Sequence, residues 1–138
     1  MNVLHLGVYA LIKREEEILL IKKLRGPYTG KLDLPGGRVE HGETPEQTVK
    51  REVAEETGLV VLESKLLNNL SVKVDFKDDR GDVSMHQIGL IYQVTVGENQ
   101  TPIAEMEMED SGGAEWFEIK NLTKDGLSPF AATLLGYE

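Results

Sequence analysis

The chain has no cysteine, few aromatic residues (6%) and no long apolar run. Without cysteine it can form neither disulfides nor thiolate-held zinc sites, so an intracellular, cytoplasmic location is the natural expectation. No apolar stretch approaches the ~20 residues that span a membrane, and the N-terminus does not have the pattern of a signal peptide. We therefore expect no membrane association.

Basic residues are also in the minority, because 15 Lys and Arg stand against 24 Asp and Glu, for a formal net charge of -9. Nonspecific nucleic-acid binding needs a basic surface, so no stable nucleic-acid partner is expected. An acidic protein can still act on phosphates when divalent cations neutralise both its carboxylates and the substrate. The length predicts one domain over residues 1–138, and leaves a monomer and a homodimer equally open.

A Gly-rich loop followed by a helix occupies residues 36–59, GGRVEHGETPEQTVKREVAEETGL. Thr44 is a good N-cap, and Gln47 completes a capping box with it. Pro45 suits the first helical position. Gly58 stands where a left-handed residue would end the helix. This segment therefore carries its own start and stop signals.

The predicted helix has an apolar strip beside an acidic one. Val49 and Val53 share a face at about 100° per residue, while Glu52, Glu55 and Glu56 crowd the neighbouring arc. Like charges three and four positions apart destabilise a helix by a few tenths of a kcal/mol per exposed pair. A cluster of oxygen ligands is, however, what Mg²⁺ requires. From these glutamates alone, a solvated acidic face and a metal site both stay open.

The whole segment favours a metal site over a solvated acidic face. From Gly37 to Leu59 it matches the Nudix box, G-x5-E-x7-R-E-U-x-E-E-x-G-U with U aliphatic, at every specified position. A chance match in a chain of this length is rarer than about one in ten million, given average residue usage. The chain therefore resembles a Nudix hydrolase. The box is specific for the superfamily and says little about the substrate.

The resemblance implies roles for the box residues. The last two glutamates of the pattern usually bind a metal, Mg²⁺ with Mn²⁺ as a substitute, and the glutamate after the arginine binds metal or assists the attacking water. The carbonyl of the glycine before the box is a common further ligand. The first glutamate and the arginine pair to brace the loop against the helix, which orients the ligands. The implied metal ligands are Gly36, Glu52, Glu55 and Glu56, and Glu43 and Arg51 complete the implied catalytic set.

Other candidates lie outside the metal set. Lys23, Arg25 and Arg38 could hold phosphate oxygens, and Arg38 is preferred because it lies inside the box loop. Many family members carry another acidic residue, as a base or extra ligand, on the loop before a strand that holds tryptophan. Glu109 and Asp110 are the candidates for that role here. Each of these acidic and basic candidates could instead be a solvated surface charge without a function. Candidates for stacking on a base are Tyr28, Phe76, His86 and Trp116, with Trp116 favoured as a core residue.

Alternating and apolar segments predict strands at residues 5–12, 18–21, 32–34, 60–68, 71–76, 85–96 and 114–119. A hairpin turn is expected at residues 77–82, an irregular acidic loop at 97–113, and a final helix capped by Ser128 with Pro129 in its first turn. Strands on both sides of one strong helix indicate an α+β domain. The resemblance implies a Nudix-type α/β/α sandwich with a mixed sheet and a loop-helix-loop catalytic motif.

The function that follows is metal-dependent hydrolysis of a pyrophosphate bond in a nucleoside diphosphate-linked substrate. A nucleoside triphosphate, oxidised purine nucleotides included, is favoured. Hydrolysis of ADP-ribose, nucleotide sugars or dinucleoside polyphosphates stays open, although a proline and a tyrosine typical of such members are missing around Lys73 to Phe76. A non-catalytic ligand-binding module is the alternative of another class. Such modules commonly lose box glutamates, whereas this chain keeps them all.

Overall fold

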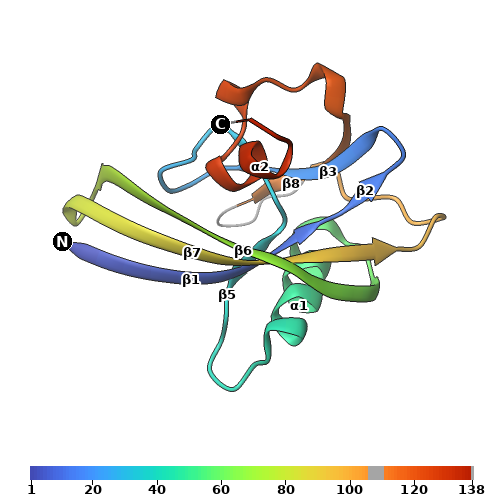
Figure 1. Ribbon diagram of the computed structural model, residues 1–138, viewed down its shortest axis with the longest axis horizontal. Helices are drawn as coiled ribbons and strands as arrows, with labels where there is room; N and C mark the ends of the chain where they lie inside the picture. The colour runs from blue at the N-terminus through green and yellow to red at the C-terminus, as the bar shows by residue number, and fades with distance from the viewer. Residues whose placement is uncertain (106–110, 138) are drawn as a thin grey trace.

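The structure, a computed structural model, describes residues 1–105 and 111–137. Two β-sheets form its middle layer, and one helix lies on each side, α1 (Pro45–Thr57) and α2 (Pro129–Leu134) (Figure 1). This is the α+β sandwich that the sequence predicts. Among the described residues, no helix is both long and apolar enough to cross a membrane.

The larger sheet has the strand order β5-β1-β7-β6 and is mixed. Its central strands β1 (Asn2–Leu11) and β7 (Gly81–Val96) run parallel, with Leu4 beside His86. The outer strands β5 (Gly36–Arg38) and β6 (Val61–Asp78) run antiparallel to them. Gly36, which precedes the box, and Gly37, its first residue, thus lie in a short edge strand against β1.

The second sheet is centred on β3 (Glu17–Lys23), which pairs antiparallel with β2 (Lys13–Arg14), β4 (Leu32–Asp33) and β8 (Ser111–Glu118). The chain leaves the first sheet at the end of β1 and enters the second sheet as the short β2, which forms a hairpin with β3.

The strands predicted separately at residues 60–68 and 71–76 form the single strand β6. Its register against β7 shifts between Val61 and Glu63 and again between Leu66 and Asn68. Each shift lets β6 take up an extra residue and stay paired along its length. Residues 69–70, between the two predicted strands, are therefore part of β6.

Two 3₁₀ turns, η1 (Ile119–Asn121) and η2 (Lys124–Gly126), lead from β8 towards α2. Ser128 stands at the predicted N-cap position of α2, but its side chain makes no capping hydrogen bond. Its hydroxyl donates instead to Oδ1 of Asp33 at 2.5 Å. The prediction of a side-chain cap was wrong because a buried carboxylate from a distant strand takes that hydroxyl.

Hydrophobic clusters fill both sides of the sheets, because successive residues of β1 point to opposite faces. Val8 is fully buried in the cluster under α1, together with Val49 and Val53 of the helix's apolar strip. Tyr9 points the other way and meets the ring of Phe130 in α2 edge-on, with centroids 5.5 Å apart. Burying the predicted strip turns the box glutamates towards the loop of residues 36–43.

Candidate active site

Helix α1 begins and ends where its capping signals predict. Thr44 Oγ1 accepts a hydrogen bond from the Gln47 amide at 3.2 Å, and Gln47 Oε1 accepts one from the Thr44 amide at 2.9 Å. At the other end, Gly58 adopts φ 77° and donates its amide proton to the carbonyl of Ala54 at 3.0 Å. These local bonds fix the helix on which the box glutamates stand.

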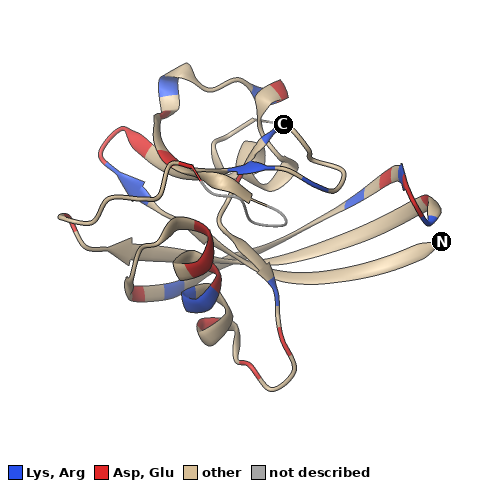
Figure 2. Ribbon diagram, turned by 180° about the vertical axis from the view of Figure 1, so that it is seen from behind, with Lys and Arg blue, Asp and Glu red and all other residues tan. Residues whose placement is uncertain are grey.

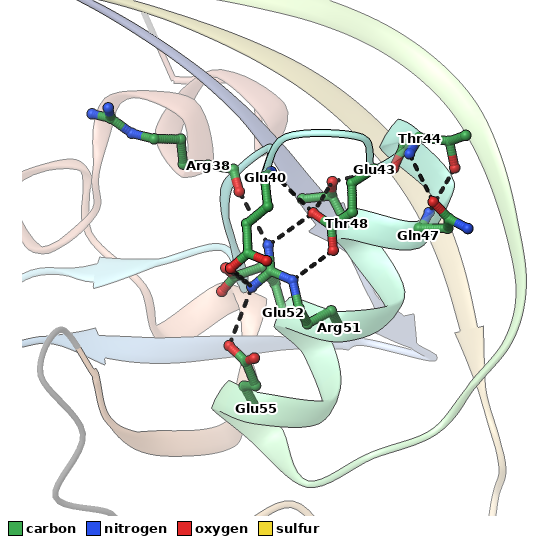
Figure 3. Close-up of polar contacts among 9 residues, drawn as sticks. All are labelled: Arg38, Glu40, Glu43, Thr44, Gln47, Thr48, Arg51, Glu52 and Glu55. Atoms are coloured by element: carbon green, nitrogen blue, oxygen red, sulfur yellow. Dashed lines mark hydrogen bonds and ion pairs between the residues drawn. The ribbon is translucent and has the colours of Figure 1, made fainter.

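Arg51 ties the loop of residues 36–43 to the helix (Figure 3). Its guanidinium forms a two-pronged ion pair with Glu43, with Nε to Oε2 at 2.7 Å and Nη2 to Oε1 at 3.0 Å. The same group reaches Glu52 Oε1 at 2.7 Å, Glu55 Oε2 at 3.3 Å and the carbonyl of Arg38 at 3.1 Å. The expected Glu43–Arg51 pair is present, and Arg51 additionally neutralises part of the acidic face of α1, which Figure 2 shows in red.

Glu43 is held by several donors at once. Besides Arg51, its Oε1 accepts from the hydroxyl of Thr48 at 2.8 Å and from the amide of Glu40 at 3.1 Å. The hydrogen bonds from Arg51 are the largest cause that lowers the pKa of Glu43 to about 2. Glu43 therefore stays ionised at any physiological pH and serves as a fixed anchor for the arginine.

Glu56 is the most deeply placed of the three box glutamates on the helix. Its side chain is almost fully buried, and Oε1 accepts the backbone amide proton of Gly36 at 2.7 Å. Burial raises the pKa of Glu56 well above its usual range, and the charge of Glu52 adds to this, while the Gly36 amide and Lys23 act in the opposite direction. A buried carboxylate of this kind is stabilised by a cation.

Glu52 lies against the backbone of Gly37. A Cβ atom on Gly37 would stand 2.6 Å from Glu52 Oε1, so only glycine leaves room for this contact. Burial raises the pKa of Glu52, whereas the hydrogen bond from Arg51 lowers it. The two glycines of β5 thus bring backbone into direct contact with two carboxylates of α1.

The chemistry of this region fits a hard divalent cation, because its acidic groups are carboxylates and, within residues 1–105 and 111–137, no ion pair reaches the buried carboxylate of Glu56. In their present positions, however, the described His, Asp and Glu side chains form no group of three that could hold a metal. Glu52 and Glu55 are turned to Arg51 instead. Metal ligation by all three glutamates therefore needs a small reorientation away from Arg51.

These residues open onto a cleft of about 700 Å³. Glu52 and Glu56 line it, and so do the three predicted phosphate contacts, Lys23, Arg25 and Arg38. The side chain of Arg38 points away from the Arg51 network in Figure 3. The fold thus brings Glu52, Glu56 and the predicted basic groups to one cavity, whereas Glu43 and Glu55 do not line it. Its volume is in the range of small-molecule sites.

The remaining candidates divide between this cleft and other places. Tyr28 and Phe76 line the cleft, whereas His86 and Trp116 do not. Trp116 borders a separate cavity of about 270 Å³, where the guanidinium of Arg14 lies 4.2 Å above its ring. Its expected core position is thus only partly realised, since it is half-buried against the α1-side cluster. The possible extra bases or ligands lie outside the described residues, namely Glu109 and Asp110.

Two buried polar residues of the cleft, Tyr9 and Gln87, were not singled out from the sequence. Tyr28 donates its hydroxyl proton to Gln87 Oε1 at 2.7 Å, and Gln87 Nε2 donates to the hydroxyl oxygen of Tyr9 at 2.8 Å. Burial raises the pKa of Tyr28 to about 12 and that of Tyr9 further still. A polar residue among apolar neighbours in a predicted strand, as Gln87 before Ile88, is the signal that could have found them.

Asp33 is a third such residue. It lies in β4 with a nearly fully buried side chain, and accepts the Ser128 hydroxyl and, at 2.8 Å, the amide of Leu34. Burial raises the pKa of Asp33, against the effect of both hydrogen bonds and of Lys23. The carboxylate lines the same cleft and adds negative charge beside Tyr9 and Tyr28.

The model of the NUDIX domain family matches residues 3–135. The structure of a MutT NUDIX hydrolase from Burkholderia pseudomallei is similar with a TM-score of 0.73 and 30% identity, over 96% of this chain and 95% of that one.

Two curated relatives match with higher identity over shorter stretches. An ADP-ribose pyrophosphatase of Methanocaldococcus jannaschii is 36% identical over 118 residues, which is 86% of this chain and 64% of the relative. An 8-oxo-dGTP diphosphatase of Haemophilus influenzae is 47% identical over 51 residues, 36% of this chain and 38% of the relative. The chain thus spans less than two thirds of the length of either relative.

Proposed function

Because the chain belongs to the Nudix family, we propose that it is a metal-dependent pyrophosphohydrolase that cleaves a phosphoric anhydride bond of a nucleotide. The observation that carries this proposal is the contact of Glu52 and Glu56 with the glycine backbone of β5 at a cleft that basic residues also line. The two carboxylates suit a cation, and the basic residues suit phosphates.

Gly36, Glu52, Glu55 and Glu56 would hold the ion, Mg²⁺ with Mn²⁺ as a substitute. When bound, the ion supplies neutralisation of the phosphate charge and a lower pKa for the attacking water. The fit rests on the buried carboxylate of Glu56 and on the carboxylates of Glu52 and Glu55 on the same helix.

The protein's own groups then have separate tasks. Glu52 lines the cleft, where it would bind the ion or accept the proton of the attacking water once it has turned from Arg51. Lys23, Arg25 and Arg38 hold phosphate oxygens, the arginines with two parallel donors each. Glu43 keeps Arg51 in place and does not contact the substrate.

A nucleoside triphosphate is the favoured substrate. ADP-ribose is the second candidate, because the archaeal relative that matches 86% of this chain is an ADP-ribose pyrophosphatase. The 8-oxo-dGTP diphosphatase relative matches a shorter stretch of this chain. The test therefore includes both classes.

The deciding experiment measures release of phosphate, pyrophosphate and nucleoside monophosphate with Mg²⁺ or Mn²⁺. The panel covers nucleoside triphosphates, ADP-ribose, nucleotide sugars and dinucleoside polyphosphates. Glu56→Gln should lower turnover by at least about 100-fold. Glu46→Gln is the matched control, since Glu46 stands on the same helix but bonds to Tyr92 outside the cleft. Full turnover in Glu56→Gln, or no turnover by the unaltered protein on any substrate, would refute the proposal.

A further inference from the structure

A hydrogen-bonded chain of three side chains lies in the wall of the cleft, and the proposed chemistry uses none of them. Tyr28 comes from the loop between β3 and β4, Gln87 from β7 and Tyr9 from β1. Their exposed fractions are 7%, 5% and 4%. The links run from the Tyr28 hydroxyl to Gln87 Oε1 at 2.7 Å and from Gln87 Nε2 to the Tyr9 hydroxyl at 2.8 Å.

The ring of Tyr9 is held in one place by close packing. A Cβ atom on Gly7 would stand 2.7 Å from the Tyr9 hydroxyl, and one on Gly36 would stand 2.6 Å from ring atom Cδ1. Phe130 meets the ring edge-on from α2. Since the missing side chains of these glycines make room for the ring, the hydroxyl at its end has a fixed position beside Gln87.

The hydrogen bonds run from Tyr28 through Gln87 to Tyr9, so the proton of the Tyr9 hydroxyl is left to donate. The Gln87 carbonyl oxygen is occupied by Tyr28, so the amide nitrogen faces Tyr9. The Tyr9 oxygen accepts that bond and keeps its own proton to donate. Within residues 1–105 and 111–137, no hydrogen bond takes up this proton. A buried donor without an acceptor is costly, which favours a ligand group that accepts it.

Nearby charges indicate what kind of acceptor fits. The carboxylates of Asp33 and Glu56 lie near Tyr9, and both line the cleft. These carboxylates repel a phosphate oxygen that carries no metal ion, whereas they do not repel a neutral carbonyl. Phe76 and Met85 also line the cleft and offer apolar surface to a planar ring.

We propose that Tyr9, positioned by Gln87 and Tyr28, donates a hydrogen bond to a carbonyl oxygen of the substrate's nucleobase, so that the site selects 6-oxopurine over 6-aminopurine nucleotides. This inference rests on the proposed function, in which the substrate is a nucleotide. An amino group in the same place could not accept the Tyr9 proton, which would stay unpaired.

The test compares ITP with ATP, whose purines differ in the oxo or amino group at position 6. The unaltered protein should show a kcat/KM at least about tenfold higher for ITP. Tyr9→Phe keeps the ring and should bring the two values within about threefold, by lowering the value for ITP. Tyr92→Phe is the matched control, because its hydroxyl bonds to Glu46 outside the cleft, and it should keep the original ratio.

A second variant tests the direction of the chain. In the order described, Tyr28 only orients Gln87, so Tyr28→Phe should lower the ITP to ATP ratio less than Tyr9→Phe does. A larger loss in Tyr28→Phe would overturn the assignment of the donor to Tyr9.

The remaining outcomes separate this inference from the function on which it rests. Hydrolysis of both nucleotides with equal efficiency, or a preference for ATP, would overturn the inference and leave the proposed function standing. If no nucleotide is hydrolysed, the proposed function fails, and calorimetric binding of IMP and AMP to the same variants still decides the inference. Tighter IMP binding that is lost in Tyr9→Phe would support it, and equal binding would overturn it.

Discussion

The backbone amide of Gly36 donates a 2.7 Å hydrogen bond to Glu56, twenty residues further along the chain. It joins the start of the box loop to the last turn of α1. At the other end of the loop, Arg51 binds Glu43 and the carbonyl of Arg38. The loop is therefore closed onto the helix at two places, which explains why the spacing of the box residues matters as much as their identity.

Replacing Arg51 by glutamine should cost function more than stability. The change removes the ion pairs that orient Glu43 and Glu52, and loss of such orienting contacts typically lowers metal affinity or activity by about 10–100-fold. The free energy of unfolding should change by about 1 kcal/mol, since partly exposed ion pairs contribute little. Mg²⁺ titration of activity and urea denaturation measure the two effects.

The control for this experiment is Arg14→Gln, which removes an arginine that pairs with Glu17 outside the cleft. It should leave the Mg²⁺ dependence unchanged. If Arg51→Gln kept both full activity and full Mg²⁺ affinity, the assigned role of Arg51 would be wrong.

Gly37→Ala should lower activity because the new Cβ atom would push against the Glu52 carboxylate, 2.6 Å away. Gly42→Ala provides the contrast, since a Cβ there meets nothing within 4 Å but the backbone has φ +85°. The second change should therefore cost about 1–2 kcal/mol of stability with little loss of kcat. Steady-state kinetics and thermal unfolding of both variants test this, and equal kinetic effects would contradict it.

Asp33→Asn should change how stability depends on pH. Burial raises the pKa of Asp33 in the folded state above its unfolded value of about 3.9. Below that value the carboxyl is protonated in both states. As the pH rises from about 4 through the folded pKa, the unfolded chain releases the proton more readily, so the unaltered protein loses stability.

The asparagine cannot ionise, and its oxygen can still accept from Ser128 and Leu34. The stability of Asp33→Asn relative to the unaltered protein should therefore rise between about pH 4 and pH 7. Urea denaturation at several pH values measures this, with Asp125→Asn as an exposed control. A difference that stays constant with pH would show that Asp33 is not destabilised by its burial.

Thr44→Ala should affect stability alone. It removes the capping bond to the Gln47 amide, which costs about 1 kcal/mol. Glu56 stands twelve residues along the helix, roughly 18 Å away, so turnover per folded molecule should not change. Thr44→Ser should restore the stability, and a kcat that fell with Thr44→Ala would indicate coupling between the cap and the site.

Much of the site follows from local signals. The capping box of Thr44 and Gln47, the left-handed Gly58 and the apolar strip of Val49 and Val53 are all present as predicted, because each depends on residues within a few positions of one another. The Glu43–Arg51 pair is also close in sequence, and the box pattern indicates it directly.

What the sequence by itself determined is thus the helix, its acidic face and the family to which the chain belongs. Only the tertiary structure decided that Arg51 also holds Glu52, that Ser128 bonds to Asp33, and that Tyr28 and Tyr9 meet through Gln87. The last two contacts join elements that are 59 to 95 residues apart in the chain. Local sequence signals cannot predict contacts over such separations, since these contacts depend on how β1, β4 and β7 pack together.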